Sequence, residues 1–374
     1  MKITIALGAF FPVPTVLGGA VEKAWLALAE EFAARGHQVT MVSRRFGSFP
    51  NEEMTRGVQH RRVPGFSAPR SLFWLKFLDL IYSFRASAAS PEADILVTNT
   101  FWLPLVVRSR SRLYVHVARF PKGQLRFYGR AARLQAPSEA IAREIRAQAP
   151  NLADRVRVIP YPAPTVARDG VRPVNQRPKR ILYVGRIHPE KGIHLLVQCF
   201  AERARTDFAD WELMITGPAN KEGGGAGDEY LERLRALAAP AADRVVFSGP
   251  IFDQARLGEA MQDAQIFVYP SLAETGESFG LAPLEAMANG CAVVVSALEC
   301  FGEFVHDGST GYTFDHRAHD PVKALGDRLR AVMADETKLA GIAQAGYEKS
   351  QEYSSPRVAD QFLKDFESIL ERAS

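Results

Sequence analysis

The chain has 374 residues and a formal net charge of +4, and 47% of its residues are hydrophobic. This length predicts two domains, each able to bury its own core, and the ordinary composition excludes fibrous and low-complexity classes. Its three cysteines are odd in number, lie in or beside apolar runs and show no metal-ligand spacing, which favours reduced thiols.

The charge is distributed unevenly along the chain. Residues 1–170 hold 24 basic and 12 acidic side chains, a net +12, so the remainder carries −8. A basic first half suits an anionic partner such as a phosphorylated acceptor or a membrane surface, and a merely solvated arginine-rich surface is an equal alternative. Nucleic acid is the least favoured partner, because the arginines belong to no recognisable nucleic-acid module.

The first half predicts a doubly wound α/β domain, 1–165. Ile3 to Leu7 predicts a buried strand, Gly18 and Gly19 a turn, and an amphipathic helix runs up to Gly36. Because a turn and a helix follow the first apolar run, we do not interpret that run as a signal peptide. Ser138 is expected to cap a helix. Further strands are expected at 38–43, 95–98, 113–117 and 134–136.

An aromatic stretch lies at 71–87. Its apolar residues cover more than one helical face, so a buried core helix is the favoured interpretation. The alternative is that part of it contacts membrane headgroups or a lipid-linked acceptor, helped by Lys76 and Arg85. No apolar run approaches the roughly 20 residues that span a bilayer. We therefore expect a cytoplasmic protein, at most peripheral at the inner face of a membrane.

The second half repeats the pattern. Residues 166–180 are rich in proline and charge and predict a linker or hinge. A second domain is expected at 181–354, and a helix near the C-terminus, within 355–374, is expected to cross back onto the first domain. Its strands are predicted at 181–184, 212–216, 245–247, 266–269 and 292–295.

The segment 277–290 contains the most informative pattern. Pro283 suits a first helical turn and Gly290 a helix end, which places Glu285 inside the first turn. A carboxylate is an acceptor for a ring diol, and the backbone N–H groups of 278–281 can bind a phosphate. Glu277 and Glu285 therefore indicate a site for a ligand that is both sugar-like and phosphorylated. Either acid alone would be an ordinary surface or helix residue.

A second loop complements that site. Arg186 and Lys191 lie in Gly-Arg-Ile-His-Pro-Glu-Lys-Gly, directly after a predicted strand, at the edge where doubly wound sheets bind ligands. Two cations there could neutralise a diphosphate leaving group. The Walker pattern and the dinucleotide fingerprint do not occur in the sequence.

With these motifs the chain resembles the family 4 retaining glycosyltransferases, which have the GT-B fold of two Rossmann-like domains facing across a cleft. The start of the chain looks most like the branch named after spore-coat polysaccharide enzymes. The matching segments are V-L-G-G-A-V-E at 16–22, R-G-H-Q-V-T at 35–40, A-P-S-E-A-I at 136–141, V-G-R-I-H-P-E-K-G at 184–192, F-S-G-P-I at 247–251, Y-P-S at 269–271, the segment 277–285 and G-S-T-G-Y at 308–312.

The resemblance implies a role for each matching residue. Glu277 would contact the transferred sugar and Glu285 the ribose of the nucleotide, with Arg186 and Lys191 on the diphosphate oxygens. The backbone near Ile251 would meet the base. His116 would be the active-site histidine near the sugar; the alternative is a satisfied strand-end core histidine. The remaining donor-binding residues would be Gly18, Gly19, Gly217, Ser278, Phe279, Gly280 and Leu281.

We therefore expect a retaining hexosyltransferase that moves a sugar from a UDP- or GDP-sugar to an acceptor hydroxyl in polysaccharide or glycoconjugate synthesis. The acceptor would be a sugar, a lipid-linked or a small molecule. No cofactor is expected beyond the donor, and no metal, because the sequence has no Asp-x-Asp. The alternatives are a sugar-nucleotide epimerase of the same fold and a noncatalytic sugar-nucleotide sensor or assembly subunit.

Overall fold

The computed structural model describes residues 1–69 and 71–371, and the chain forms two compact units. Unit 1 comprises residues 1–162 and 355–374, and unit 2 comprises residues 163–354. The helix expected near the C-terminus is α11 (Ser355–Glu371), which belongs to unit 1; residues 372–374 lie outside the described residues. No helix in 1–69 or 71–371 combines the length and the apolar character needed to span a membrane.

Unit 1 is built on a sheet of order β3-β4-β2-β1-β5-β6-β7-β8, parallel except for the β3–β4 pair. Its strands are β1 (Lys2–Ala6), β2 (Gln38–Arg44), β3 (Glu52–Thr55), β4 (Val58–Val63), β5 (Ile95–Thr98), β6 (Arg112–His116), β7 (Arg133–Ala136) and β8 (Val156–Val158). Its α-helices are α1 (Ala20–Ala34), α2 (Leu72–Ala89), α3 (Leu103–Val106), α4 (Glu139–Gln148) and α11.

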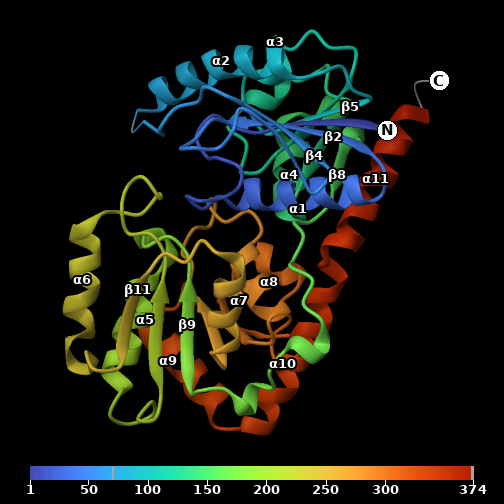
Figure 1. Ribbon diagram of the computed structural model, residues 1–374. Helices are drawn as coiled ribbons and strands as arrows, with labels where there is room; N and C mark the ends of the chain where they lie inside the picture. Colours follow the sequence, from blue (N-terminus) through green and yellow to red (C-terminus); the bar gives the residue numbers. More distant parts are fainter. Residues whose placement is uncertain (70, 372–374) are drawn as a thin grey trace. The chain divides into compact units, whose positions relative to one another are not determined.

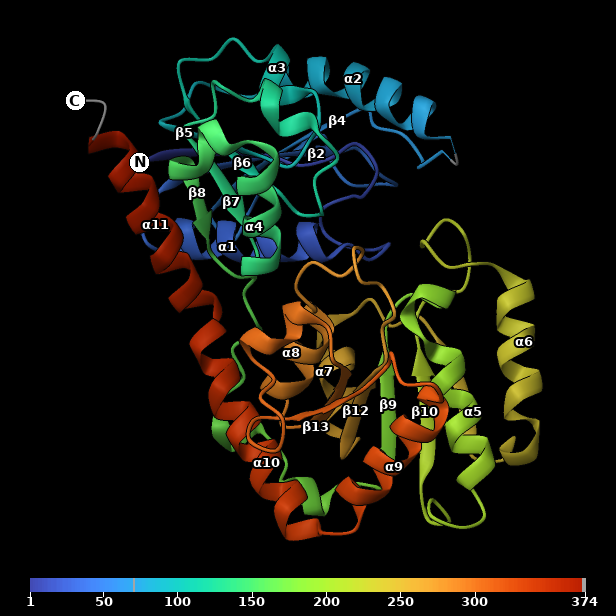
Figure 2. The ribbon, with the colours of Figure 1, turned by 180° about the vertical axis from the view of Figure 1, so that it is seen from behind.

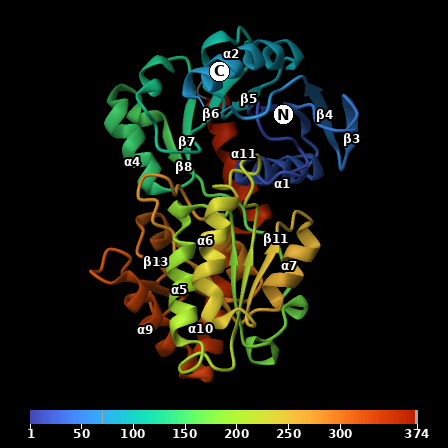
Figure 3. The same ribbon diagram turned by 90° about the vertical axis from the view of Figure 1, so that its left-hand side faces the viewer.

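Two apolar clusters sandwich this sheet. One joins α2, α3 and α4 to the sheet, and the other joins α1 and α11. Figure 1 shows α1 and α2 on opposite sides of the strands. Ser138 caps α4 as expected, its hydroxyl accepting from the Ile141 N–H at 3.4 Å. The β3–β4 hairpin at the sheet edge (Figure 3) was not predicted, because β3 is short and mostly exposed and has no alternating apolar pattern.

A buried ion pair attaches α11 to unit 1. The Arg133 guanidinium lies 2.6 Å from Oδ1 of Asp365, and its Nε donates to Oδ2 at 3.0 Å. The Tyr114 hydroxyl donates to the same Oδ2 at 3.0 Å. Burial and the neighbouring carboxylate raise the pKa of Tyr114 well above its usual value, so the phenol remains a donor. The last helix is therefore held by polar bonds as well as by its apolar face.

Unit 2 contains one parallel sheet of order β11-β10-β9-β12-β13-β14. Helix α5 packs beside α6 and α9, and α8 packs beside α10 (Figure 2). The strands are β9 (Arg180–Val184), β10 (Glu212–Thr216), β11 (Val245–Gly249), β12 (Ile266–Tyr269), β13 (Ala292–Ser296) and β14 (Tyr312–Phe314). The α-helices are α5 (Ile193–Arg203), α6 (Asp228–Ala238), α7 (Gln254–Gln262), α8 (Leu281–Ala288), α9 (Pro321–Met333) and α10 (Glu336–Ser350).

The segment 166–180, expected as a linker, is instead packed into unit 2. Arg177 is buried, and its guanidinium donates to the carbonyls of Arg172 at 2.6 Å, Asn289 at 2.8 Å and Ala264 at 3.0 Å. These charge-assisted hydrogen bonds hold the backbone around Arg177 in place, so the prolines of this segment do not make it a flexible linker. This segment is thus part of the unit 2 scaffold.

Candidate functional site

The strand order of unit 2 brings the two predicted loops together. Strand β9 lies between β10 and β12, so the chain changes direction across the sheet at β9. Parallel doubly wound sheets bind ligands at such a point, beyond the carboxyl ends of the strands. The loop after β9 carries Arg186 and Lys191, and the loop after β12 carries Glu277.

Backbone contacts hold these two loops against each other. The Leu272 N–H donates to the Glu190 carbonyl at 2.8 Å. Gly192 has a φ of 64°, and a Cβ at this position would lie 1.9 Å from the Pro270 carbonyl oxygen. Only glycine permits both the left-handed backbone and this close approach. The position of Lys191, one residue earlier, is therefore fixed by the crossing of the loops.

Lys191 and Glu277 form an ion pair at the centre of the site. Lys191 Nζ lies 2.7 Å from Glu277 Oε2, and the two side chains are only 7% and 11% exposed. The Ser271 hydroxyl donates to the same oxygen at 3.1 Å, and the ammonium lies 5.4 Å from the centre of the Tyr269 ring. Sequence reasoning found the two charges, but it missed Ser271 and Tyr269 as their supports.

Arg186 lies at the edge of the same loop and is half-exposed. Its guanidinium donates to Glu190 Oε1 at 2.7 Å and to the Gly224 carbonyl at 3.0 Å. The Tyr183 hydroxyl donates to the Arg186 carbonyl at 3.0 Å. The glycine-rich segment 217–227, to which no role could be given from sequence, thus packs against this arginine and orients it.

The glycine at the end of β10 allows the strand ends to crowd together. Gly217 has a φ of 152°, and a Cβ there would lie 1.8 Å from the Gly185 carbonyl oxygen. Ile251, expected near the base, follows β11, the next strand of the sheet. The residues predicted to bind the donor in unit 2 therefore follow four neighbouring strands, β11, β10, β9 and β12.

Helix α8 begins at Leu281 after Gly280, which has a φ of 90° and gives no side-chain cap. The first N–H groups of a helix have no partner within the helix and attract anions. A Cβ on Gly280 would lie 2.3 Å from the Phe301 ring. The expectation that Glu285 lies in the first turn is wrong, because the helix starts earlier than Pro283 suggested and Glu285 occupies the second turn.

The remaining residues of this segment are largely buried. Glu285 is 6% exposed, and the Phe279 ring packs against Phe304 and Tyr353 at centroid distances of 5.4 and 6.2 Å. Ser278 and Phe279 precede the glycine that caps α8. The side chain of Phe279 therefore belongs to the core of unit 2.

His116, Gly18 and Gly19 belong to unit 1. His116 ends β6 and is fully buried; its Nε2 bonds the Tyr161 hydroxyl at 2.9 Å and its Nδ1 bonds Oε1 of Gln135. Burial lowers the pKa of His116 to about 4, so the ring is neutral at physiological pH. Both ring nitrogens have protein partners, which is the geometry of a strand-end core histidine.

Glu22 is a buried acid that sequence reasoning passed over. It lies in the first turn of α1, and a Cβ on Gly19 would come within 2.4 Å of its Oε2, so the carboxyl folds back over the glycine turn. Burial raises the pKa of Glu22 to about 7, although a backbone hydrogen bond and the charge of Arg119 both act to lower it. The Gly-Gly-Ala-Val-Glu sequence could have indicated this buried acid, because Gly19 has no side chain and leaves room for the Glu22 carboxyl.

Replacing Glu22 with glutamine is expected to change how stability depends on pH. The folded-state pKa is raised from 4.5 to about 7, so between these values the folded protein binds a proton that the unfolded chain has lost. Wild-type stability therefore falls as pH rises through this window. The stability of Glu22→Gln relative to wild type should rise with pH, by roughly 3 kcal/mol in total. Urea unfolding at about pH 5 and about pH 8 tests this; a pH-independent difference would contradict it.

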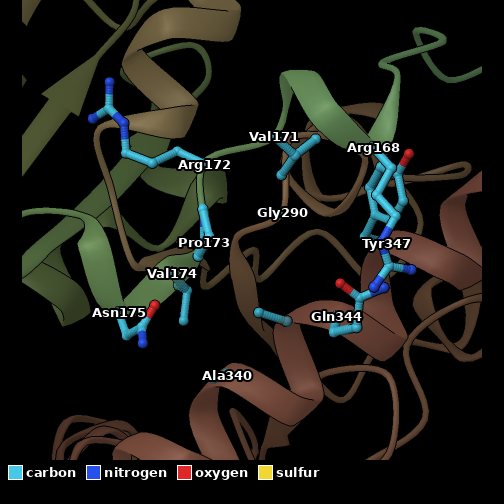
Figure 4. A pocket seen from close by; sticks show the side chains of 11 residues that line it. Arg168, Val171, Arg172, Pro173, Val174, Asn175, Gly290, Ala340, Gln344 and Tyr347 are labelled. Carbon is cyan, nitrogen blue, oxygen red and sulfur yellow. The ribbon is translucent and has the colours of Figure 1, made fainter.

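A separate pocket of about 310 Å³ lies in unit 2, between the segment 168–175 and α10 (Figure 4). Three of its polar side chains have protein partners: Arg172 pairs with Asp263 at 2.7 Å, Arg168 with Glu348 at 3.5 Å, and Tyr347 donates to the Val166 carbonyl. In Figure 4 the Arg172 guanidinium points away from the pocket. We assign this pocket no ligand. Neither Lys191 nor Glu277 lines this pocket.

Comparison with known proteins assigns the chain to a family. The model of glycosyl transferases group 1 matches residues 169–349, and that of glycosyltransferase family 4 matches residues 18–165. The phosphatidyl-myo-inositol mannosyltransferase of Mycobacterium leprae is 32% identical over 197 residues, which cover 52% of this chain and 48% of that protein. The lipopolysaccharide 1,2-N-acetylglucosaminetransferase of Salmonella typhimurium is 33% identical over 175 residues, 45% of each chain. The alignments thus span about half the length of these curated relatives.

Solved structures show the same fold over the full chain. A sucrose-phosphate synthase from Thermosynechococcus elongatus superposes with a TM-score of 0.78 at 22% identity, covering 100% of both chains. Anabaena HepE, in complex with UDP and glucose, gives a TM-score of 0.74 at 19% identity and covers 98% of this chain and 100% of its own. With both family models matched, one in each unit, the chain belongs to the family 4 glycosyltransferases and has the GT-B fold.

Proposed function

We propose that this chain is a nucleotide-sugar-dependent glycosyltransferase that retains the anomeric configuration of the sugar. The observation that carries the proposal is the buried Lys191–Glu277 pair at the point where the strand order of unit 2 reverses. A cation for the diphosphate and a carboxylate for sugar hydroxyls lie side by side there, next to the start of α8. The UDP-sugar bound by HepE and the mannosyltransferase activity in the name of the M. leprae relative support the same reading.

Each residue of unit 2 has a part in this proposal. Lys191 and Arg186 neutralise the diphosphate as the bond from its oxygen to the sugar C1 breaks. Glu277 holds the sugar hydroxyls, Glu285 binds the ribose, and the backbone near Ile251 meets the base. The N–H groups at 278–281 and the backbone at Gly217 line the phosphates.

We propose front-face attack for the transfer step, as the family resemblance implies. The acceptor oxygen bonds to C1 on the face from which the diphosphate departs, and the departing phosphate oxygen accepts the acceptor's proton. His116 would act through a neutral imidazole, which requires exchange of one of its two present hydrogen bonds. The acceptor is proposed to be a sugar, a lipid-linked or a small-molecule hydroxyl.

The test is a panel of UDP- and GDP-sugars, first by thermal shift and then by release of nucleoside diphosphate. A true donor at a hundred times its dissociation constant should stabilise the protein by about 2.7 kcal/mol. The release of nucleoside diphosphate should persist in EDTA, because Lys191, Arg186 and α8 supply the positive charge. Among the described residues no cluster of His, Cys, Asp or Glu is suited to hold a metal ion.

The outcomes separate the alternatives. Loss of turnover in EDTA would overturn the phosphate assignment to Lys191 and Arg186. Stabilisation by a donor with no release of nucleoside diphosphate, even with acceptor extracts, would favour a sugar-nucleotide sensor. Conversion of donor to its epimer without acceptor would favour an epimerase. No stabilisation by any donor would remove the basis of the proposal.

A further inference from the structure

Helix α2 presents a large apolar surface to solvent. The interpretation of 71–87 as a buried core helix is wrong for its first turns and for Phe84, where the apolar residues are exposed; among the aromatic residues of the helix, Tyr82 alone is buried. The Phe73 side chain is 70% exposed and Trp74 52%. The exposed apolar residues of α2, which we call the α2 outer face, are Leu72, Phe73, Trp74, Phe77 and Phe84.

The other face of α2 is anchored, so the exposure is a fixed property of the helix. Tyr82, Ser83 and Ala86 are fully buried, and Tyr82 and Ala86 belong to the apolar cluster of unit 1. Asp79 is also buried, and its Oδ2 accepts from the N–H groups of Phe101 and Trp102 at 3.1 and 3.3 Å. The helix therefore cannot turn its outer face inward without breaking these bonds.

Three rings of the α2 outer face, those of Phe73, Trp74 and Phe77, form one contiguous surface. The Phe73 and Trp74 ring centroids are 5.7 Å apart, and those of Trp74 and Phe77 also 5.7 Å. Adjacent exposed aromatics of this size are avoided on a solvated surface unless something covers them. Trp in particular suits the boundary between water and lipid, since its ring is apolar and its N–H is polar.

The charge on α2 indicates which partner covers this face. Asp79 is the helix's single acid, and it is buried and hydrogen-bonded. Lys76 and Arg85 are exposed, and unit 1 lies in the half of the chain that carries the excess of basic residues. The Lys76 ammonium lies 4.6 Å from the centre of the ring of Phe101, in the loop after β5, so the position of this cation on α2 is fixed by a ring outside the α2 outer face. Exposed aromatics flanked by cations and without exposed carboxylates match an anionic lipid surface.

We propose that α2 docks unit 1 on an anionic phospholipid membrane, with the α2 outer face in the headgroup region and Lys76 and Arg85 at the phosphates. The docking depends on unit 1 alone, and it holds whichever donor or acceptor unit 2 and its site use. The protein would then be peripheral, held by one surface helix.

The test is flotation of the full chain with vesicles of equal parts phosphatidylglycerol and phosphatidylcholine, and with phosphatidylcholine alone. Wild type should float with the anionic vesicles and bind less at high salt. The double variant Phe73→Ser with Trp74→Ser should lose about tenfold or more of this binding, because two large apolar side chains no longer enter the interface. Val246→Ser is the matched control, since Val246 is an exposed apolar residue of unit 2, and it should float like wild type.

Several results would overturn the proposal. It is overturned if wild type fails to float, if it floats equally with phosphatidylcholine alone, or if the double variant floats as well as wild type. Sedimentation of wild type as a dimer that the double variant abolishes, without vesicle binding, would assign the face to a second copy of the chain. Both substituted side chains are exposed, so the thermal midpoint of the double variant should match that of wild type and exclude misfolding.

Discussion

Replacing Glu277 with alanine is expected to lower the rate of sugar transfer by about a hundredfold to a thousandfold, the usual effect of removing one preorganised polar group from an active site. Glu277 Oε2 is bonded to Lys191 at 2.7 Å and to Ser271 at 3.1 Å in a nearly buried position. Its loss removes the proposed sugar contact and leaves the lysine without its carboxylate. The measurement is kcat and KM with the donor found in the thermal-shift panel.

The control separates catalysis from folding. Removing one partner of a buried ion pair costs about 3–5 kcal/mol, so Glu277→Ala will also lower stability. The double variant Lys191→Met with Glu277→Gln leaves no unpaired charge and should recover much of that stability, yet it should remain inactive. Normal transfer by a folded Glu277→Ala protein would show that the site has been assigned wrongly.

Replacing Asp365 with alanine is expected to destabilise unit 1 by about 3–5 kcal/mol, because Arg133 would remain buried without a carboxylate. The two side chains are 2% and 8% exposed, and Tyr114 would lose its acceptor as well. The expected consequence is release of α11 from unit 1. Urea unfolding followed by tryptophan fluorescence measures it, since Trp25, which packs against Phe362 of α11 at 5.0 Å, reports on this contact.

Asp360 provides the matched control for this experiment. It lies on the same helix and pairs with Arg35 at 3.3 Å, but its side chain is 55% exposed. Asp360→Ala should therefore cost less than about 1 kcal/mol. Equal effects of the two substitutions would mean that the buried pair contributes no more than a surface one.

Much of the fold could be predicted from the sequence because its central strands are continuous apolar runs. Strands β5, β10 and β12 have the predicted bounds, since each is a short apolar segment between polar turns. Strands β3, β8 and β14 were missed because edge strands are short and only partly apolar. Strand β4 was missed because two of its buried residues, His60 and Arg62, are polar. The expected linker could not be distinguished from a packed segment, since the contacts that fix Arg177 join residues about 90 to 110 positions away.

The sequence predicted that the charged residues of the candidate site lie together, but it did not predict the side chains that contact them. Lys191 and Glu277 are 86 positions apart, and their pairing follows from the neighbouring positions of β9 and β12, which a rule for doubly wound sheets anticipates. Tyr269 and Ser271 belong to a segment that matches the family, but that match gave them no role, because a hydroxyl beside a strand end has many ordinary uses. The prediction of a buried core helix at 71–87 failed for a different reason. An apolar run in the sequence does not show whether its residues pack inside the protein or form an exposed apolar surface.

The crossing of the two loops has a bearing on protein engineering. The backbone contacts at Glu190–Leu272 and at Gly192 set the spacing of Lys191 and Glu277 without help from the side chains around a ligand. If the pair binds the sugar as proposed, exposed side chains of the two loops can be exchanged to change the sugar that is accepted, whereas Ser271 and Tyr269, which contact the pair, should be kept. Attempts to alter substrate preference should leave the two glycines, Gly192 and Gly217, untouched and confine diversity to the exposed positions of these loops.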